Sequence, residues 1–368
     1  MLTKHYYWIQ SLILCHVPYN FAFYVHHHGS GHLMRAIAIA ETLKDCNLTF
    51  MGSGLAAKRK LIPTHVTIVD LPFDFENKPE IKGEDEIYGL HYAPLNINGQ
   101  RSRVALMADF FANTYPLLLI VDVSVEVAML ARLSGVPTII IRQHGKRTDL
   151  PHEIAYRNAL GLIAPYHVKM NGSESTWLTS KTFFAGGLSR FKPEADKSII
   201  DERKVGILIG NGGTSINLAL LKHIANMCPD WNFQVLGKLE DIAINCKNLI
   251  FHGDVLDPRI ILRGCCIVIG NAGHNTVMEM GALNKRLILI PEKRPFDEQL
   301  EKAQIVEQLG LAEIVLPELC FKVDWNKILL NLLPNQRNWA PLIDTNAAEK
   351  AGKYIKVSYQ NFFNLFKR

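Results

Sequence analysis

The chain has 368 residues, a length that suggests about two domains of ordinary size. Apolar residues make up 48% of the sequence, which is enough for substantial cores and excludes a disordered protein. The net charge is only +5 and Lys and Arg are not clustered, so no nucleic-acid partner is expected, whereas phosphate-bearing substrates fit this charge.

Residues 1–20 are interpreted as an N-terminal extension ahead of the first core strand. The stretch 6–15 is apolar and aromatic, but Gln10 and Ser11 interrupt it and no small-residue cleavage site follows, so an extra packed segment is favoured over a signal peptide. No uninterrupted apolar run reaches the roughly 20 residues that span a bilayer. The seven cysteines contain no CxxC pair, which predicts a reduced, cytoplasmic enzyme.

Residues 21–25 predict the first core strand, and a glycine-containing loop leads from it into a helix over 33–44. The loop and the helix start carry the pattern Gly-x-Gly-His-x-x-Arg at 29–35. We expect this loop to face a cleft between domains. The residues expected to bind an acceptor there are His28, Gly29, Ser30, Gly31 and Arg35.

Three histidines, at 26–28, end the first strand. Side chains alternate along a strand, so the three do not converge on one point, and no carboxylate or cysteine is spaced with them as a ligand. No metal site is predicted, and cleft-lining or packing roles are expected instead.

Two later stretches bear on partners. Residues 58–60, Lys-Arg-Lys among apolar neighbours, fit either a peripheral contact with the inner membrane face or an ordinary solvated helix face, and the second is favoured. Residues 72–98 show no period. Because a loop of this length in a compact domain is usually functional or disordered, we assign it to acceptor binding.

A buried strand expected over 117–122 ends in an acid, Asp122. Side chains at the carboxyl ends of parallel strands point into the crevice, so Asp122 is a candidate for orienting a catalytic group. It is equally compatible with a cap for the helix expected over 125–133.

The next strand, expected over 136–141, is followed by Arg142, His144 and Lys146. By the same crevice argument these side chains line the cleft. We expect Arg142 and His144 to contact a phosphorylated or otherwise anionic acceptor.

The alternation of strand and helix restarts after Gly186 and Gly187, which provide a hinge. A strand over 205–209 leads into a turn that contains Gly210, Gly212 and Gly213. No Gly-Lys-Ser/Thr follows, so this turn is not a Walker A loop and ATP hydrolysis is disfavoured.

Residues 266–290 read as strand, glycine turn, helix and strand. In this unit the backbone N–H groups at the helix start receive an anion, usually phosphate. Gly270 and Gly273 allow the backbone to approach closely. The other residues of the turn and the helix start are Asn271, Ala272, His274, Asn275 and Thr276, and the last two add polar groups at the cap.

Polar side chains beyond this turn extend the predicted site. Glu279, one helical turn further on, is placed to hold the hydroxyls of a ribose. Asp297, Glu298 and Gln299 follow the next strand, at the mouth of the same crevice. Phosphate, ribose and then a polar trio fit a nucleotide-sugar better than a bare nucleotide.

Alternation of strands and helices with short connections predicts an α/β protein of two doubly wound, Rossmann-like domains that face each other across a cleft. We place an acceptor domain at 21–187 and a nucleotide-sugar donor domain at 188–368.

The patterns at 29–35 and 270–299 resemble glycosyltransferase family 28 of the GT-B fold, whose best-known member adds N-acetylglucosamine to lipid I in peptidoglycan synthesis. In that family a glycine turn holds the diphosphate, a helix glutamate holds the uridine ribose, and an acid/Gln–Gln pair holds the sugar. Gly273, Glu279 and Gln299 fall at the matching positions. The family's turn is commonly serine–glycine-rich, whereas here it carries His274 and Asn275.

The resemblance implies further roles. The loop histidine transfers a proton in these relatives, so His32 becomes the candidate general base, with an unperturbed pKa near 6.5 that suits the task; its alternative is a helix-capping residue without chemistry. Some relatives use an Asp–His pair, which would make Asp122 its partner. The turn Gly210, Asn211, Gly212, Gly213 and Thr214 would approach the donor, Val255 would hold the uracil, and the final helix would cross back onto the first domain.

The function implied is that of an inverting, metal-independent glycosyltransferase without a cofactor, which moves a sugar from a UDP-sugar to a lipid-linked or saccharide acceptor. The alternatives are a UDP-sugar hydrolase in which His32 activates water, and a non-catalytic nucleotide-sugar sensor. An epimerase is less expected because no set of cleft carboxylates is evident. A Rossmann dehydrogenase fits worst, since the turn at 29–32 lacks the third glycine of the dinucleotide fingerprint.

Overall fold

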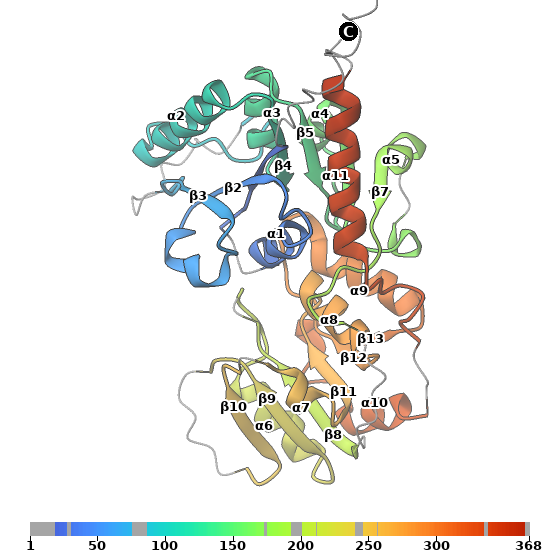
Figure 1. Ribbon diagram of the computed structural model, residues 1–368. Helices are drawn as coiled ribbons and strands as arrows, with labels where there is room; N and C mark the ends of the chain where they lie inside the picture. The colour runs from blue at the N-terminus through green and yellow to red at the C-terminus, as the bar shows by residue number, and fades with distance from the viewer. Residues whose placement is uncertain are drawn as a thin grey trace, which may run out of the picture.

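The computed structural model describes residues 19–27, 31–75, 87–172, 175–192, 201–210, 212–239, 246–255, 257–334 and 338–364. Two parallel sheets organise them (Figure 1). The first has seven strands in the order β3-β2-β1-β4-β5-β6-β7, and the second has six in the order β10-β9-β8-β11-β12-β13. In both sheets the order reverses beside the first strand, as in doubly wound folds. The predicted architecture of two doubly wound α/β domains is confirmed.

The strands of the first sheet are β1 (Asn20–Tyr24), β2 (Asn47–Gly52), β3 (Val66–Asp70), β4 (Leu118–Asp122), β5 (Thr138–Ile141), β6 (Gly161–Ala164) and β7 (Thr182–Phe184). Those of the second are β8 (Asp201–Leu208), β9 (Asn232–Leu236), β10 (Leu249–Gly253), β11 (Cys265–Gly270), β12 (Arg286–Leu289) and β13 (Ala312–Ile314).

Most of the helices connect successive strands, and the last two follow the final strand. They are α1 (Gly31–Ala40), α2 (Asn98–Asn113), α3 (Val125–Leu133), α4 (Leu150–Asn158), α5 (Thr176–Lys181), α6 (Leu218–Met227), α7 (Arg259–Leu262), α8 (His274–Ala282), α9 (Glu298–Gln308), α10 (Trp325–Leu332) and α11 (Ala347–Asn364). Short 3₁₀ turns occupy Ala56–Leu61, Val168–Met170, Pro295–Asp297 and Pro317–Leu319. None of the helices in the described ranges is long and apolar enough to cross a membrane.

The strands are apolar on both faces because helices cover both. On β1, Phe21 and Phe23 pack with α1 and α11, whereas Ala22 and Tyr24 face the cluster formed with α2 and α3. This two-sided burial explains why the strand sequences are continuous apolar runs.

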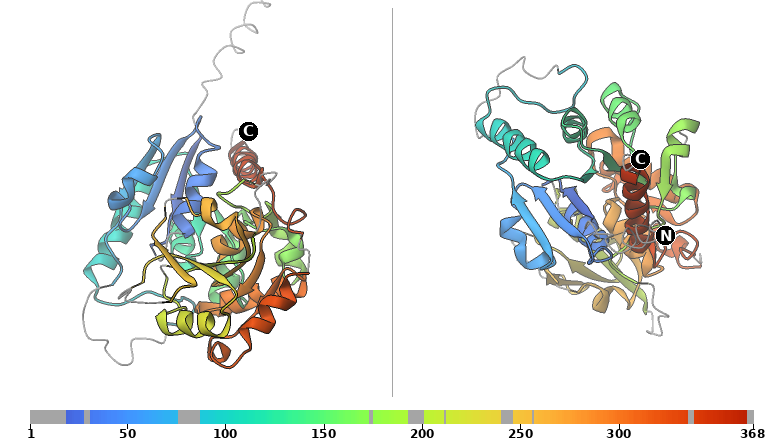
Figure 2. Two further views of the ribbon diagram at one scale, coloured as in Figure 1. Left: turned by 90° about the horizontal axis from the view of Figure 1, so that it is seen from below. Right: turned by 45° about the horizontal axis from the view of Figure 1, so that its top comes forward.

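The last helix leaves the second domain and packs on the first. Ala351 and Ile355 of α11 share a buried cluster with α1, and Figure 1 and the right-hand view of Figure 2 show α11, in red, beside the blue and green elements of the first sheet. Gly352 permits the close crossing, since a Cβ there would lie 2.2 Å from the Thr42 Oγ1. The chain therefore passes between the domains twice.

Candidate active site

Two residues predicted to be catalytic lie together at the carboxyl edge of the first sheet. Asp122 is the last residue of β4, and β4 pairs with β1, whose chain leads into α1 and His32. The His32 Nδ1 lies 3.1 Å from the Asp122 Oδ1. Behind them, Arg35 donates to Asp122 from Nε at 3.2 Å and from one terminal nitrogen at 3.0 and 3.1 Å. The result is a His–Asp–Arg arrangement in which Asp122 and Arg35 are buried and His32 is partly exposed.

The protonation of this group follows from its surroundings. Asp122 is only 3% exposed, and burial alone would raise its pKa, but Arg35 and His32 outweigh burial and hold the pKa well below its usual range. The same Arg35 nitrogen also lies 3.1 Å from the His32 Nδ1. Because an ionised carboxylate is the stronger acceptor, we assign the Nδ1 proton to the bond with Asp122. The Nε2 of His32 then carries the lone pair.

Arg35, which was expected to bind an acceptor, lines the small cavity beside Glu279. It is only 2% exposed, and Asp122 engages its guanidinium.

The backbone after Asp122 shows that this residue does not cap the following helix. Val123 has a φ of 66°, an unfavourable value for a β-branched residue, and Ser124 then caps α3 by accepting from the Val127 N–H. Since Ser124 provides the cap, the alternative in which Asp122 caps this helix is wrong, and the carboxylate is directed to His32 and Arg35.

In the second domain, β11, its turn and α8 form the predicted unit for binding an anion. Gly273 precedes α8 and offers no side chain to cap it, so the first N–H groups of the helix have no side-chain cap. Asn271 instead fixes the turn, donating to the Ile290 carbonyl at 3.0 Å and to Glu292 at 3.1 Å. The start of α8 faces α1: a Cβ on Gly31 would lie 3.6 Å from the Asn275 Nδ2.

His274 opens α8 in a buried position and is 6% exposed. Burial, together with the charges of Arg35 and Lys302, lowers its pKa well below the usual value, so the ring is neutral. Its Nε2 is buried and makes no hydrogen bond with the described residues. The helix start therefore presents a neutral ring nitrogen without a partner.

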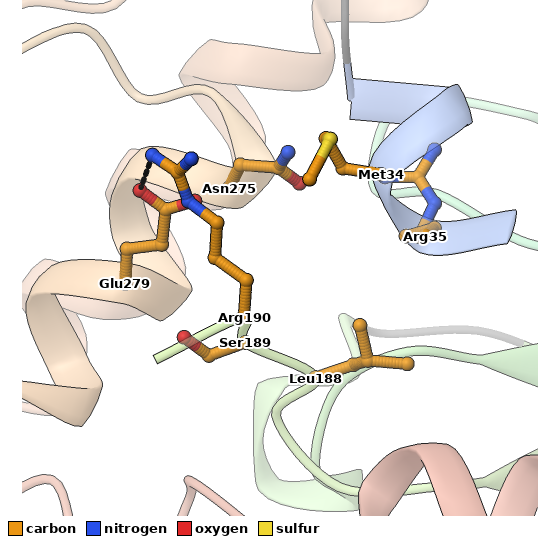
Figure 3. A pocket seen from close by; sticks show the side chains of 7 residues that line it. All are labelled: Met34, Arg35, Leu188, Ser189, Arg190, Asn275 and Glu279. Atoms are coloured by element: carbon orange, nitrogen blue, oxygen red, sulfur yellow. Dashed lines mark hydrogen bonds and ion pairs between the residues drawn. The ribbon is translucent and has the colours of Figure 1, made fainter. Parts of the chain in front are cut away.

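Glu279 makes a contact that the sequence did not reveal. Its Oε1 lies 2.7 Å from the Arg190 Nε, and Arg190 follows the Gly186–Gly187 linker (Figure 3). Burial raises the pKa of Glu279, and Arg190 opposes this shift. The cavity beside the pair, which Met34 of α1 and Asn275 of α8 also line, measures only about 10 Å³, room for about one water molecule.

The three polar residues after β12, Asp297, Glu298 and Gln299, have different partners. Asp297 pairs with Lys146 of the first domain at 2.9 Å, and the Oε1 of Glu298 accepts from Lys302 at 3.2 Å. Burial would raise the pKa of Glu298, but Lys302 and Arg147 lower it overall. Gln299 is 7% exposed and accepts from the Glu292 N–H at 3.0 Å.

Glu292 and Arg294, which the sequence did not single out, hold the glycine turn after β8. The Glu292 Oε1 accepts from the N–H of Ser215 at 2.6 Å and from its hydroxyl at 2.7 Å. Arg294 donates to the carbonyls of Gly212 and Gly213 at 2.5 and 2.6 Å. The only signal in the sequence for this role was the position of Glu292 and Arg294 after β12, because the residues they bind lie about 80 positions earlier in the chain.

The structure also describes most of the other residues that the sequence predicted for the donor site of the second domain. Gly210 approaches Asn271, with an added Cβ 3.7 Å from its Oδ1, and Thr214 accepts from the Ile216 N–H at 3.0 Å. The predictions for His28, Gly29, Ser30 and Asn211 fall outside the described residues. The carbonyl of the turn residue Ala272 accepts a hydrogen bond from Lys302. Thr276 lies in the first turn of α8. Val255 packs against the apolar cluster to which α8 contributes.

Arg142 and His144, expected to contact an acceptor, are turned inward. Arg142 is 1% exposed and donates to the Thr182 hydroxyl at 2.9 Å. His144 is 3% exposed, with its Nε2 3.0 Å from the Met170 carbonyl, and burial lowers its pKa well below the usual value. Neither lines the cavity between Glu279 and Arg35.

One cluster in the described part of the chain has the composition of a metal site. Asp149 lies 2.8 Å from the His91 Nε2 and 2.7 Å from the His152 Nδ1. Arg147 occupies the other His152 nitrogen at 2.9 Å, so Nδ1 keeps its proton. Burial and Arg147 lower the pKa of His152 to about 4. A protonated Nδ1 beside a guanidinium does not suit a cation, and the cluster fits a hydrogen-bonded network better.

Comparison with known proteins agrees with the sequence patterns. Residues 260–356 match the model of the glycosyltransferase family 28 C-terminal domain. A protein of Thermodesulfovibrio yellowstonii, named as the UDP-N-acetylglucosamine–N-acetylmuramyl-(pentapeptide) pyrophosphoryl-undecaprenol N-acetylglucosamine transferase, is 26% identical over 78% of this chain and 82% of its own length. An Exiguobacterium protein of the same name is 25% identical over 78% of this chain and 84% of its own length.

Among solved structures, the calicheamicin glycosyltransferase CalG4 superimposes with a TM-score of 0.64 at 13% identity, covering 94% of this chain and 99% of that one. This likeness concerns the fold. The resemblance to family 28 and the GT-B fold predicted from the sequence is confirmed, and the findings support a nucleotide-sugar glycosyltransferase of the family 28 and GT-B type.

Proposed function

We propose that the chain transfers a sugar from a UDP-sugar to a hydroxyl of a lipid-linked or saccharide acceptor, with inversion at the anomeric carbon. The observation that carries the proposal is that His32, at the start of α1, is partly exposed and pairs with the buried Asp122. The start of α1 also faces the start of α8. A base from one domain and an anion-binding helix end from the other thus border one space. Two relatives named for a UDP-N-acetylglucosamine donor support the choice of nucleotide.

In the proposed reaction, the Nε2 of His32 takes the proton of the acceptor hydroxyl as its oxygen attacks the anomeric carbon. The bond from that carbon to the donor's phosphate oxygen breaks, and its electron pair leaves with UDP. Attack opposite the leaving group inverts the centre. Asp122 stabilises the imidazolium that forms, because its carboxylate remains ionised.

The leaving diphosphate gains negative charge, which the start of α8 stabilises. The uncapped N–H groups and the helix dipole direct positive potential there, and the neutral ring of His274 can add an N–H donor. In this proposal the charge needs no metal ion. Glu279 accepts from the ribose hydroxyls once Arg190 releases it.

Donor entry also requires movement. The cavity of about 10 Å³ beside Glu279 cannot hold a nucleotide, so either the two domains separate or Arg190 turns away. The Gly186–Gly187 linker, where Gly186 has a φ of 93°, provides a pivot for both movements.

A thermal-shift panel with UDP, dTDP, GDP, CDP, NAD and several UDP-sugars tests the donor. A ligand that binds only the folded protein adds roughly 2.7 kcal/mol at 100 times its dissociation constant. We expect UDP and one or more UDP-sugars to raise the melting temperature and NAD to leave it unchanged. A shift with NAD alone, or with none of these ligands, would contradict the proposal.

Variants then assign the roles. His32→Ala should abolish turnover and leave UDP affinity nearly intact, whereas Glu279→Ala should weaken UDP binding by about 1–3 kcal/mol. His65→Ala, on the far side of the first domain where its ring meets the Ala40 carbonyl, is the matched control and should change neither. UDP release without an acceptor, lost in His32→Ala, would replace the transferase with a hydrolase.

A further inference from the structure

Gln143 joins the catalytic group of the first domain to the second domain. It follows β5 and is 7% exposed. Only one orientation of its amide gives both ends a partner of the right kind, with the oxygen towards Arg35 and the nitrogen towards Glu298. The oxygen then accepts from a terminal nitrogen of Arg35 at 2.7 Å. The nitrogen donates to both carboxylate oxygens of Glu298, at 2.7 and 3.0 Å.

Glu298 determines this orientation, and it belongs to the second domain as the first residue of α9. Burial would raise the pKa of its carboxyl, but Lys302 and Arg147 outweigh burial, so the group is ionised. An ionised carboxylate accepts hydrogen bonds and cannot donate one. The amide nitrogen of Gln143 must therefore face Glu298, which leaves the amide oxygen facing Arg35.

The hydrogens of Arg35 show what the amide oxygen achieves. The terminal nitrogen that faces Gln143 also lies 3.0 and 3.1 Å from the two Asp122 oxygens, and 3.1 Å from the His32 Nδ1. A terminal guanidinium nitrogen carries two hydrogens. With one directed to Asp122 and the other to Gln143, neither is left for His32. The Nδ1 of His32 therefore keeps its own proton for the bond to Asp122, and Nε2 keeps the lone pair.

Without the amide oxygen this arrangement has a competitor. The second hydrogen of the Arg35 nitrogen can then be donated to the His32 Nδ1, which lies 3.1 Å away. A ring that accepts at Nδ1 carries its proton on Nε2. In that tautomer His32 has no lone pair at the atom that has to take a proton, so the ring cannot act as a base.

We propose that Gln143 is a positioning residue that sets the tautomer of His32 through Arg35, and that it does so while Glu298 of the second domain faces it. The inference rests on the proposed function, in which the Nε2 of His32 is the base. Domains that have separated for donor entry lose the contact between Gln143 and Glu298. Closure therefore completes the base, and the residue that completes it lies beside the donor turn, because Lys302 bridges Glu298 and the Ala272 carbonyl.

The tautomer is measured first and without any substrate, by nitrogen NMR of protein labelled with nitrogen-15 in its histidines. At pH 8.5 an ordinary imidazole, with a pKa of about 6.5, is neutral. The signals of His32 are identified by their loss in His32→Ala. We expect the wild-type ring to carry its proton on Nδ1. Gln143→Met keeps the length of the side chain but lacks the amide, and it should move most of the population to the Nε2 tautomer. Gln304→Met, at an exposed position of α9, is the matched control and should leave the spectrum unchanged.

A double variant reverses the polarity of the bridge. Gln143→Glu combined with Glu298→Gln keeps an oxygen towards Arg35 and places an amide nitrogen opposite it, so the proton should return to Nδ1. A wild-type ring protonated on Nε2 would overturn the proposal even if Gln143→Met did not fold. An unchanged tautomer in Gln143→Met, or the Nε2 tautomer in the double variant, would overturn it as well.

Turnover is measured next, with the UDP-sugars that stabilise the protein. Gln143→Met should lower kcat at least about tenfold and leave the KM for the donor within about twofold, because the base is impaired and the donor site is not. A raised KM with an unchanged kcat would show that Gln143 only supports the donor site, and would refute the positioning role. Failure of every UDP-sugar to bind would refute the proposed function, and the nitrogen spectra would still decide whether Gln143 sets the tautomer.

Discussion

Replacing Asp122 by Asn removes the charge at the centre of the His32–Asp122–Arg35 group without changing its shape. The amide can still accept a bond from Arg35, but it can also donate to the His32 Nδ1 and hold the ring in the other tautomer. The proton then resides on Nε2, where the proposed mechanism needs a lone pair. We expect turnover to fall about 10²–10⁴-fold, the range that a positioned general base supplies, with little change in UDP affinity.

The same change has a cost in stability that follows from burial. Arg35 is 2% exposed, and removing one partner of a buried ion pair costs about 3–5 kcal/mol because the other charge is left uncompensated. Because the Asn amide oxygen can still accept hydrogen bonds from Arg35, we expect a loss of stability near the lower end of this range. Because the folded-state pKa of Asp122 lies below that of the unfolded chain, its stabilisation is complete above about pH 4 and is lost as the pH falls further. Unfolding at pH 7 therefore measures the full effect.

Urea unfolding at pH 7 and initial rates of UDP release measure the two effects separately. Asp297→Asn is the matched control for stability, since its pair with Lys146 is exposed and should contribute little to the free energy of unfolding. The double variant Arg35→Met/Asp122→Asn should recover stability but not turnover, because it leaves no uncompensated buried charge. Wild-type turnover in Asp122→Asn, or a stability loss no larger than that of Asp297→Asn, would refute this reasoning.

Three further outcomes are expected. Arg190→Met should raise the pKa of Glu279 further, because it removes the cation that now opposes the effect of burial. The ratio of UDP affinity at pH 7.5 to that at pH 5.5, measured by calorimetry, should therefore be larger than in the wild type. An unchanged ratio would show that Arg190 does not control the pKa of this carboxylate. Gly352→Ala should lower the free energy of unfolding by about 1–3 kcal/mol through the clash with Thr42, and Thr42→Ala in the same chain should restore most of it in urea titrations. The pKa of His152 falls from about 6.5 in the unfolded chain to about 4 on folding, so the free energy of unfolding should decrease by about 3 kcal/mol as the pH drops from 6.5 to 4. His152→Asn should flatten this part of the curve of unfolding free energy against pH. An identical curve would exclude His152 as the group responsible.

Local patterns in the sequence predicted the architecture well. The β11 turn and α8 are recognisable because a buried run, two glycines and a helical period lie within about 20 consecutive residues. The same holds for β1 and α1. Doubly wound topology then places the carboxyl ends of the strands at one edge, so Asp122 could be directed towards the crevice before its partner was known.

Interactions between distant segments were not predictable in the same way. Arg35 and Asp122 are 87 residues apart, and nothing around Arg35 indicates that its guanidinium turns inward. Arg142 follows the end of a strand, and a period of two cannot tell which side of the sheet such a residue takes; here it donates to Thr182. Arg190 is an ordinary linker cation until Glu279 is placed beside it.

The return of α11 to the first domain has a consequence for synthesis on the ribosome. The face of β1 that carries Phe21 and Phe23 obtains its full cover only when residues 347–364 have been made, after every strand of both sheets. Growing chains therefore expose an apolar surface during translation of the entire second domain, although N-terminal domains usually fold first. A nascent chain stalled at residue 346 should be cleaved by protease within 19–187, whereas one that also carries the helix and a spacer long enough to clear the exit tunnel should resist.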